Sequence, residues 1–156
     1  MESDKATFTK SSETQVVMER VFSAAKDAVF RAYSDPNLIP LWWGPANLTT
    51  TVEKMDFRPG GMWRYVQRDG DGREFVFHGI YQEILPSGCM ASSFEFEGTP
   101  GHTQMVSAIF EDMQGQTKLT SRTTFQSAED RDAALDSGME ASAGDSMDRL
   151  AALVEK

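Results

Sequence analysis

The chain has 156 residues, with 15 Lys and Arg against 24 Asp and Glu, and therefore a net charge of −9. This length fits one domain, and a hydrophobic content of 40% is that of a folded globular protein rather than a disordered or membrane-embedded one. Residues 1–78 carry ten basic and eleven acidic side chains, whereas residues 79–156 carry five and thirteen. Because no basic stripe is present to displace counterions from a phosphate backbone, a nucleic-acid partner is not expected.

The single cysteine, Cys89, precludes an internal disulfide and is expected to be a structural strand residue. No apolar run reaches the roughly 18–20 residues of a membrane span, and the first residues lack the apolar stretch of a signal peptide. We therefore expect a cytoplasmic protein without membrane insertion. Residues 1–12 are polar and lack periodicity, which predicts a flexible lead-in to a single domain over residues 13–156.

A strand and two short helices are predicted first. Apolar and polar residues alternate from Thr14 to Phe22, as in a half-buried strand. Ser23 can cap a helix that continues to Asp35, and Asp35-Pro36 begins a second short helix with the proline in its first turn. Gly44-Pro45 ends this second helix.

Six further strands follow, separated by turns. Alternation and turn residues predict them at 49–57, 62–68, 73–85, 89–97, 103–112 and 117–125. Asp69-Gly70-Asp71-Gly72 is typical of a hairpin, because Asp and Gly tolerate the positive φ that a primed turn requires. Short connections between these strands predict a mostly antiparallel sheet.

From Ser127 onward the sequence has the period of a helix. Apolar residues from Leu135 to Val154 recur every three or four positions and form one stripe, with the acidic residues off it. Gly138 and Gly144 each cost about 1 kcal/mol relative to Ala in a helix interior, so they indicate a bend or a close approach. The pattern predicts an α+β fold in which a long C-terminal helix covers one face of an antiparallel sheet.

Several motifs, in one order along the chain, resemble a known family. They are Arg20-Val-Phe-Ser-Ala-Ala, Val29-Phe30-Arg-Ala-Tyr-Ser-Asp-Pro36, Trp42-Trp43-Gly44-Pro45, Asp56-Phe-Arg-Pro-Gly-Gly61-Met-Trp63-Arg, Asp71-Gly72, Gly79-Ile-Tyr81-Gln-Glu83-Ile-Leu-Pro86 and Thr117-Lys-Leu-Thr120. Together they resemble the family of the C-terminal domain of the heat-shock-protein-90 ATPase activator. This family lies in the SRPBCC superfamily, which also holds START lipid-transfer domains, polyketide cyclases and the birch-pollen allergen fold.

The resemblance covers about residues 14–154 and implies a helix-grip fold. In that fold a curved antiparallel sheet of about six to seven strands wraps the long C-terminal helix and leaves a cavity between them. Where relatives usually have Gly-Trp in this helix, the chain has Ser142-Ala143. Removing a large ring from the cavity-facing stripe would enlarge the pocket. Such a fold does not by itself specify chemistry.

Within this fold, an aromatic and thioether-rich set of side chains becomes the candidate cavity lining. Tyr and Trp combine an apolar body with a polar tip, and Met adapts to irregular ligands. The candidates are Trp43, Trp63, Tyr65, Phe77, His78, Tyr81, Phe94, Met105, Phe110, Met139, Ala143 and Met147. The alternative is that these side chains fill a solid core.

Two polar residues have directions that matter for function. The strand around His78 is apolar on both faces, so this histidine either serves the cavity as a base or hydrogen-bond partner or lies on the surface. Strict alternation turns Arg20 inward, where it needs a carboxylate, either from Glu83 or from a ligand. No HExxH or CxxC motif occurs, so neither a metal nor another cofactor is predicted.

Three functions remain open. The first is binding of a small, largely hydrophobic molecule between the sheet and the C-terminal helix. The second is a cyclase, dehydrase or hydrolase that uses His78, Tyr65 or Tyr81 as acid or base in the same pocket, although no catalytic motif is present. The third rests on the resemblance alone and is a chaperone-regulating interaction module. A homodimer through sheet edges or the short helices is also compatible with the sequence.

Overall fold

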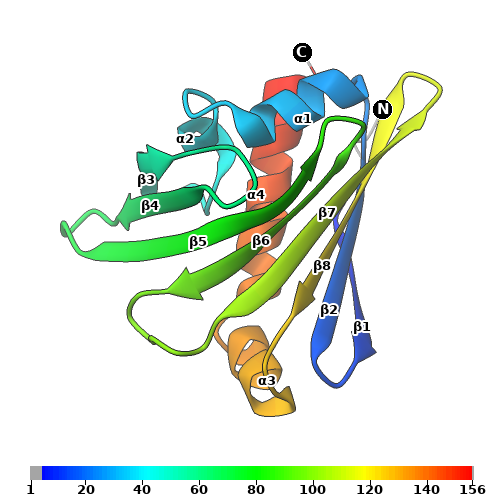
Figure 1. Cartoon of the computed structure of the whole chain (residues 1–156). Helices are drawn as coiled ribbons and strands as arrows, with labels where there is room; N and C mark the ends of the chain where they lie inside the picture. Colours follow the sequence, from blue (N-terminus) through cyan, green and yellow to red (C-terminus); the bar gives the residue numbers. More distant parts are fainter. Residues whose placement is uncertain (1–4, 156) are drawn as a thin grey trace.

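The computed structural model describes residues 5–155, which form one antiparallel sheet of eight strands and four helices (Figure 1). The strands are β1 (Thr7–Ser12), β2 (Gln15–Phe22), β3 (Thr49–Met55), β4 (Met62–Arg68), β5 (Glu74–Leu85), β6 (Cys89–Phe96), β7 (Gln104–Met113) and β8 (Gln116–Thr124). The helices are α1 (Lys26–Ser34), α2 (Ile39–Trp42), α3 (Ala128–Asp136) and α4 (Met139–Val154). In space the strands follow the order β1-β2-β8-β7-β6-β5-β4-β3. The predicted α+β class is confirmed.

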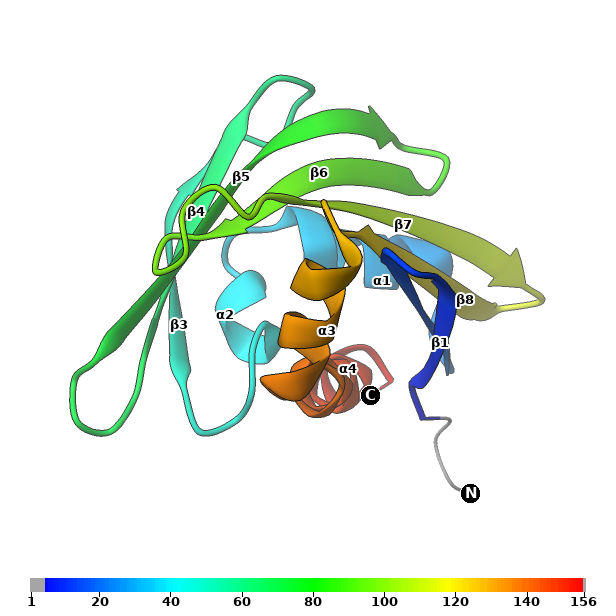
Figure 2. The same ribbon diagram turned by 90° about the horizontal axis from the view of Figure 1, so that it is seen from below.

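The sheet is curved, and α2, α3 and α4 lie on its concave side (Figure 2). Alternate residues of each strand therefore point toward the helices or away from them. In β2, for example, Val16, Met18, Arg20 and Phe22 are buried and the residues between them are partly exposed. Helix α4 buries Met147, Leu150 and Ala151 in the same core. This is the helix-grip arrangement that the family resemblance implies.

Strand β1 lies in the region where the sequence predicts a flexible lead-in. It pairs antiparallel with β2, from Thr7 opposite Glu19 to Ser12 opposite Gln15, and Phe8 packs against the core. Five of its six side chains are exposed, so backbone pairing rather than burial holds the strand, and the apolar pattern is weak. The sheet accordingly has eight strands rather than six to seven. Residues 1–4 of the predicted lead-in lie outside the described residues.

Both short helices begin later than the sequence predicts. Helix α1 has Ala25 at its N-cap, whereas the predicted cap, Ser23, donates its backbone N–H to Glu155 at 2.8 Å. Helix α2 is a single turn whose first-turn proline is Pro40 rather than Pro36. Ser23 therefore precedes the N-cap of α1 by two residues.

The C-terminal segment forms two helices rather than one long helix. Ser127 caps α3 by accepting a hydrogen bond from the Asp130 N–H at 3.1 Å. Gly138, with a left-handed φ of 94°, separates α3 from α4, so the predicted bend is present there. At Gly144 a Cβ would meet nothing within 4 Å, so no close approach explains that glycine. Within residues 5–155 no helix is long and apolar enough to span a bilayer.

Candidate functional site

A cavity of about 110 Å³ lies between the concave face of the sheet and the two short helices. One side comes from α1, α2 and the residue that follows α2, and the floor comes from the adjacent strands β4 to β8. The lining residues are Tyr33, Ile39, Trp42, Trp43, Trp63, Tyr65, Tyr81, Met90, Ser92, Phe94, Val106, Ala108 and Ser121. They offer rings, aliphatic groups and hydroxyls, but no ionisable side chain other than tyrosine.

Small side chains on three neighbouring strands leave the space unfilled. Ser92, Ala108 and Ser121 occupy inward positions of β6, β7 and β8. Ala108 pairs directly with Ser121, and Ser92 lies diagonal to Ala108, because Ser92 pairs with Val106 and Ala108 pairs with Met90. Protein cores are normally close-packed, so this run of small residues is the direct cause of the cavity.

Trp43 is the centre of an aromatic cluster at the β4–β6 side of the cavity. Its ring meets Tyr65 at 5.0 Å and Phe77 at 5.3 Å between centroids, both edge-on, and lies 6.3 Å from the ring of Trp63. Phe94 extends the cluster, with its centroid 5.9 Å from that of Trp63. Edge-to-face pairs contribute about 0.5–1.5 kcal/mol each beyond their burial, so these contacts stabilise this wall of the cavity.

The loop that carries Trp43 is held by polar side chains of α4. Three hydrogen bonds join them: Gly44 N–H to Ser146 Oγ (2.8 Å), Ala46 N–H to Asp145 Oδ2 (2.7 Å) and Arg149 Nη1 to the Gly44 carbonyl (2.8 Å). Gly44 has a φ of 92°, and a Cβ there would overlap the side-chain amide of Gln67. Only glycine fits this turn, which fixes where Trp43 enters the cavity wall.

The indole of Trp63 lies directly on the backbone of β5. Gly79 is its partner in the β4–β5 register, and a Cβ on Gly79 would approach the indole Nε1 to 2.5 Å and overlap the carbonyl oxygen of Ser93. The Trp63 Nε1–H is buried without a hydrogen-bond partner in the described part of the chain. The missing side chain at Gly79 is therefore what lets a large flat ring form this part of the wall.

Tyr65 and Tyr81 bring two hydroxyl groups together. Burial raises the pKa of both tyrosines, that of Tyr81 to about 12. Electrostatic and hydrogen-bonding interactions with Tyr81 raise the pKa of Tyr65 further, and the interaction with Tyr65 opposes the rise at Tyr81. The Tyr65 hydroxyl donates to the Met55 sulfur at 4.0 Å. Burial also raises the pKa of Tyr33. All three phenols therefore stay protonated at neutral pH and serve as hydrogen-bonding groups rather than bases.

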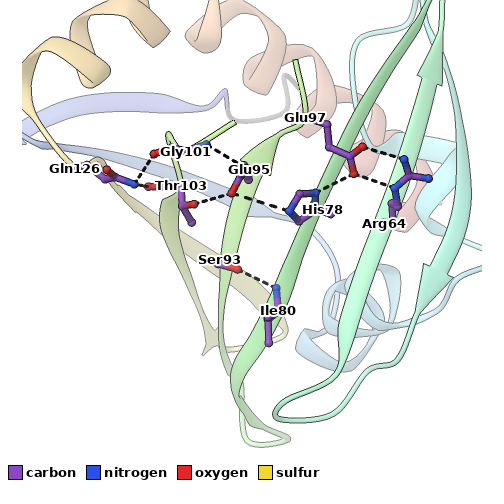
Figure 3. Close-up of polar contacts among 9 residues, drawn as sticks. All are labelled: Arg64, His78, Ile80, Ser93, Glu95, Glu97, Gly101, Thr103 and Gln126. Carbon is purple, nitrogen blue, oxygen red and sulfur yellow. Dashed lines mark hydrogen bonds and ion pairs between the residues drawn. The ribbon is translucent and has the colours of Figure 1, made fainter. Parts of the chain in front are cut away.

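His78 lies on the convex face of the sheet and does not line the cavity. Its Nδ1 is 2.9 Å from Glu97, and its Nε2 is 4.0 Å from Glu95 (Figure 3). Two hydrogen bonds of 2.9 Å from Arg64, with a smaller contribution from His78, lower the pKa of Glu97 to about 2. Within residues 5–155 no three His, Cys, Asp or Glu side chains are placed to hold a metal ion, this cluster included.

Five of the twelve predicted lining residues lie in the cavity wall, namely Trp43, Trp63, Tyr65, Tyr81 and Phe94. Three more pack in the core but not in the lining: Phe77, Phe110 and Met147. Met105 lies on the convex face like His78, because its sulfur is 3.9 Å from Gln82 and its neighbours Val106 and Ala108 have the inward parity. Met139 and Ala143 are half-buried near the start of α4, outside the lining. The Ser142-Ala143 departure therefore does not enlarge this cavity.

The sequence misses three kinds of lining residue. Tyr33, Ile39 and Trp42 come from short helices in which too few turns are present to define a face. On β6, Met90 and Ser92 share the parity of Phe94, so strict alternation could have found them. The sequence does not predict Ser121 and Ala108 as lining residues. A small side chain leaves a cavity only if its spatial neighbours do not fill the space, and the sequence alone does not identify those neighbours.

Arg20 points inward, as alternation predicts, but its partner is Asp148 rather than Glu83. The Nη1–Oδ1 distance is 2.7 Å, with the Arg20 side chain 1% exposed and that of Asp148 64% exposed. Glu83 is exposed on β5. Asp148 lies off the apolar stripe of α4, and the pair ties β2 to α4. No ligand carboxylate is needed to neutralise this arginine.

Residues 23–155 match the model of a family described as activator of Hsp90 ATPase homolog 1-like protein. The chain belongs to this family. The Hsp90-activator-like family also accounts for the helix-grip architecture, in agreement with the resemblance to the SRPBCC superfamily. No curated protein matches the sequence.

Several solved structures share the fold of this Hsp90-activator-like chain. A protein from Rhodobacter sphaeroides is 22% identical with a TM-score of 0.91, over 97% of this chain and 99% of that one. A protein from Arthrobacter aurescens is 22% identical with a TM-score of 0.89, over 96% and 91% of the two chains. A protein from Mycobacterium smegmatis is 24% identical with a TM-score of 0.86, over 96% of each chain. At these identities the similarity shows the fold alone.

Proposed function

We propose that this protein binds a small, largely apolar molecule in the cavity between the sheet and helices α1 and α2. One observation carries the proposal: all three tryptophans and all three tyrosines of the chain line this cavity, above a floor of small side chains. Burial of apolar ligand surface contributes roughly 25 cal/mol per Å², and the hydroxyls give orientation. The sequence predicted such a pocket against the C-terminal helix, whereas here α4 supports the wall without lining it.

The volume restricts the size of the molecule. Typical pockets for drug-sized ligands have volumes of roughly 300–1,000 Å³, and an engineered apolar cavity of about 150 Å³ binds benzene. A cavity of about 110 Å³ therefore suits one small ring or one end of a longer molecule.

Catalysis in this pocket has less support than binding. His78 is on the other face of the sheet, and no carboxylate, imidazole or amine lines the cavity. The lining tyrosines have raised pKa values, so they are poor bases near neutral pH. A cyclase or hydrolase would have to rely on hydroxyl hydrogen bonds alone.

The family name carries a second candidate, regulation of an Hsp90-type ATPase. We would test it by adding the protein to the Hsp90 homologue of the same organism and measuring ATP hydrolysis and co-purification. Unchanged hydrolysis together with no complex would remove this candidate and leave ligand binding untouched.

A cavity-filling variant tests the binding proposal. Thermal shift followed by calorimetry with small aromatics, fatty acids and sterols should identify compounds that stabilise the wild type. Ala108→Leu adds three carbons to the cavity floor and should abolish that stabilisation, with Ser121→Val as a milder second variant. Ala91→Leu is the matched control, because Ala91 lies on the opposite face of the neighbouring strand. The proposal fails if no compound stabilises the wild type, or if both filled variants bind as the wild type does.

A further inference from the structure

We infer that the ligand is a neutral molecule with one hydroxyl or carbonyl group, and that the Ser92 hydroxyl binds this group. The inference rests on the proposed function and names the chemical class of molecule that the cavity takes. Three features lead to it: the absence of charge in the lining, a serine hydroxyl without a protein partner, and the position of that serine beside the aromatic wall.

The cavity has no charged group that could neutralise an ionised ligand. No Lys, Arg, His, Asp or Glu side chain lines it. Arg20, which is buried on the same face of the sheet, is already paired with Asp148 at 2.7 Å. An ionised group moved from water into such a site is strongly disfavoured unless a counter-charge is present. A carboxylate or ammonium ligand would lose its hydration without compensation, so the ligand is neutral.

Ser92 offers the cavity a hydroxyl group that the protein does not use. Its side chain lies in the lining, and its Oγ has no hydrogen-bond partner within residues 5–155. The unpartnered polar atoms that are sealed off from any small molecule in this part of the chain are Arg20 Nε and Trp63 Nε1. The Ser92 oxygen is not among them and therefore remains open to the cavity. A hydroxyl without a partner is unfavourable, so a ligand oxygen that pairs with it gains affinity.

The other polar groups of the aromatic wall are covered or already engaged. Trp63 Nε1 is buried over the strand backbone, since a Cβ on Gly79 would meet both this nitrogen and the carbonyl oxygen of Ser93. A ligand oxygen in the cavity does not reach this N–H. The Tyr65 hydroxyl donates to the Met55 sulfur at 4.0 Å.

Ser92 lies where the aromatic wall meets the floor of small side chains. It is two residues from Phe94 on β6, so the two side chains point the same way from Cα atoms about 7 Å apart. The rings of Phe94 and Trp63 lie 5.9 Å apart between centroids and form the neighbouring wall. A small ring that packs on this wall, edge-on or offset, brings an oxygen substituent to Ser92.

Ser121 is the second serine of the lining, and its hydroxyl also lacks a partner within residues 5–155. It lies on β8, which is two strands from β6 in the sheet. Strands are spaced by about 4.8 Å, so Ser121 is roughly 10 Å farther from the aromatic wall than Ser92. One ring with one oxygen does not span that distance. Ser121 therefore provides a matched control for Ser92.

Ligands of equal size and two serine variants test the inference. Phenol and toluene differ by OH against CH₃, and benzoate adds a charge. Calorimetry at about pH 7, where phenol is neutral, would measure the affinity of each compound for the wild type, Ser92→Ala and Ser121→Ala. Each variant removes one hydroxyl oxygen from the same cavity, so only the position of the lost oxygen differs between them.

The expected result is selective. Ser92→Ala should weaken phenol binding about fivefold and change toluene binding by less than about twofold, while Ser121→Ala should change neither by more than about twofold. Benzoate should show no binding. The inference is overturned if Ser92→Ala leaves phenol binding unchanged or weakens both ligands equally, if Ser121→Ala weakens phenol binding as much, or if benzoate binds as well as phenol. Binding of long-chain compounds but of neither ring overturns the inference while the proposed function stands, whereas no binding by any apolar compound overturns both.

Discussion

The two faces of the sheet handle polar groups in opposite ways. On the convex face, Arg64, His78, Glu95 and Glu97 form a continuous chain of ion pairs and hydrogen bonds in contact with solvent (Figure 3). On the concave face the polar groups are few, and most are the hydroxyls of tyrosine and serine around a cavity. The convex groups satisfy one another, whereas on the concave face two buried donors, Arg20 Nε and Trp63 Nε1, have no partner within residues 5–155. The contrast shows that the cavity lies where polarity is sparse, although the convex face holds the more conspicuous polar cluster.

The largest expected effect comes from breaking the Arg20–Asp148 ion pair on the concave face. Asp148→Ala leaves Arg20 buried without its counter-charge and should lower the free energy of unfolding by about 3 kcal/mol. The control is Glu74→Ala, which breaks a pair of the same length, 2.7 Å, between half-exposed partners, and should cost less than about 1 kcal/mol. Urea unfolding of both variants measures the difference. Equal losses would mean that burial of Arg20 does not set the strength of its pair.

A methyl group at the centre of the concave face should have the next largest effect. Gly79→Ala places a Cβ against the Trp63 indole and the Ser93 carbonyl, and such overpacking costs about 1–3 kcal/mol. Gly70→Ala in the β4–β5 turn, where a Cβ meets nothing within 4 Å, should be nearly neutral. Thermal unfolding and near-ultraviolet circular dichroism would compare them. A Gly79→Ala protein with wild-type stability and spectrum would contradict the packing described for Trp63.

Acid should weaken the convex face in a defined range of pH. The folded pKa of Glu97 is about 2 against an ordinary value of 4.5, so its stabilising contribution is complete above about pH 4.5 and disappears as the pH falls toward 2. Glu97→Gln should therefore reduce stability at neutral pH and flatten its decline in acid. Urea unfolding at about pH 7 and about pH 3 measures this slope, with the exposed Glu111→Gln as control. A wild-type slope in Glu97→Gln would assign the acid sensitivity to other groups.

The smallest effect is a change of absorbance at alkaline pH. Because burial raises the tyrosine pKa values, the stabilisation from keeping these phenols neutral is complete below about pH 10 and is lost as the pH rises through 12 at Tyr81. The folded protein should show no phenolate absorbance at pH 10, while the urea-unfolded chain titrates around that pH. A folded tyrosine that ionises with a midpoint near 10 would show that the concave face is open to water.

The sequence predicts more of the fold than of the site, for physical reasons. Strand positions, the Asp69–Gly72 hairpin and the inward parity of Trp63, Tyr65 and Tyr81 follow from local alternation and turn chemistry. The direction of His78 does not, since its strand carries apolar residues on both faces and only the pairing with β4 and β6 decides it. Asp148 as the partner of Arg20 also depends on contacts between residues 128 positions apart.

The division of the C-terminal segment into α3 and α4 is another feature that local sequence patterns do not predict. The apolar stripe continues through Gly138, so periodicity alone favours one helix. The structure ends α3 there because the glycine adopts a left-handed φ, and α3 buries no residue that would hold it in line with α4. The helix-breaking tendency of Gly138 thus opposes the helical periodicity of the surrounding residues. Periodicity alone does not show which of the two prevails, because that depends on tertiary packing.

The confinement of all three tryptophans to the cavity wall gives the protein an internal optical reporter. Emission from Trp42, Trp43 and Trp63 arises within one small volume, with no indole elsewhere in the chain to dilute it. A molecule that enters the cavity changes the polar surroundings of all three indole rings at the same time. Wavelength, lifetime and quenching by external solutes therefore become direct measures of occupancy, in the unlabelled protein and at concentrations far below those that calorimetry needs.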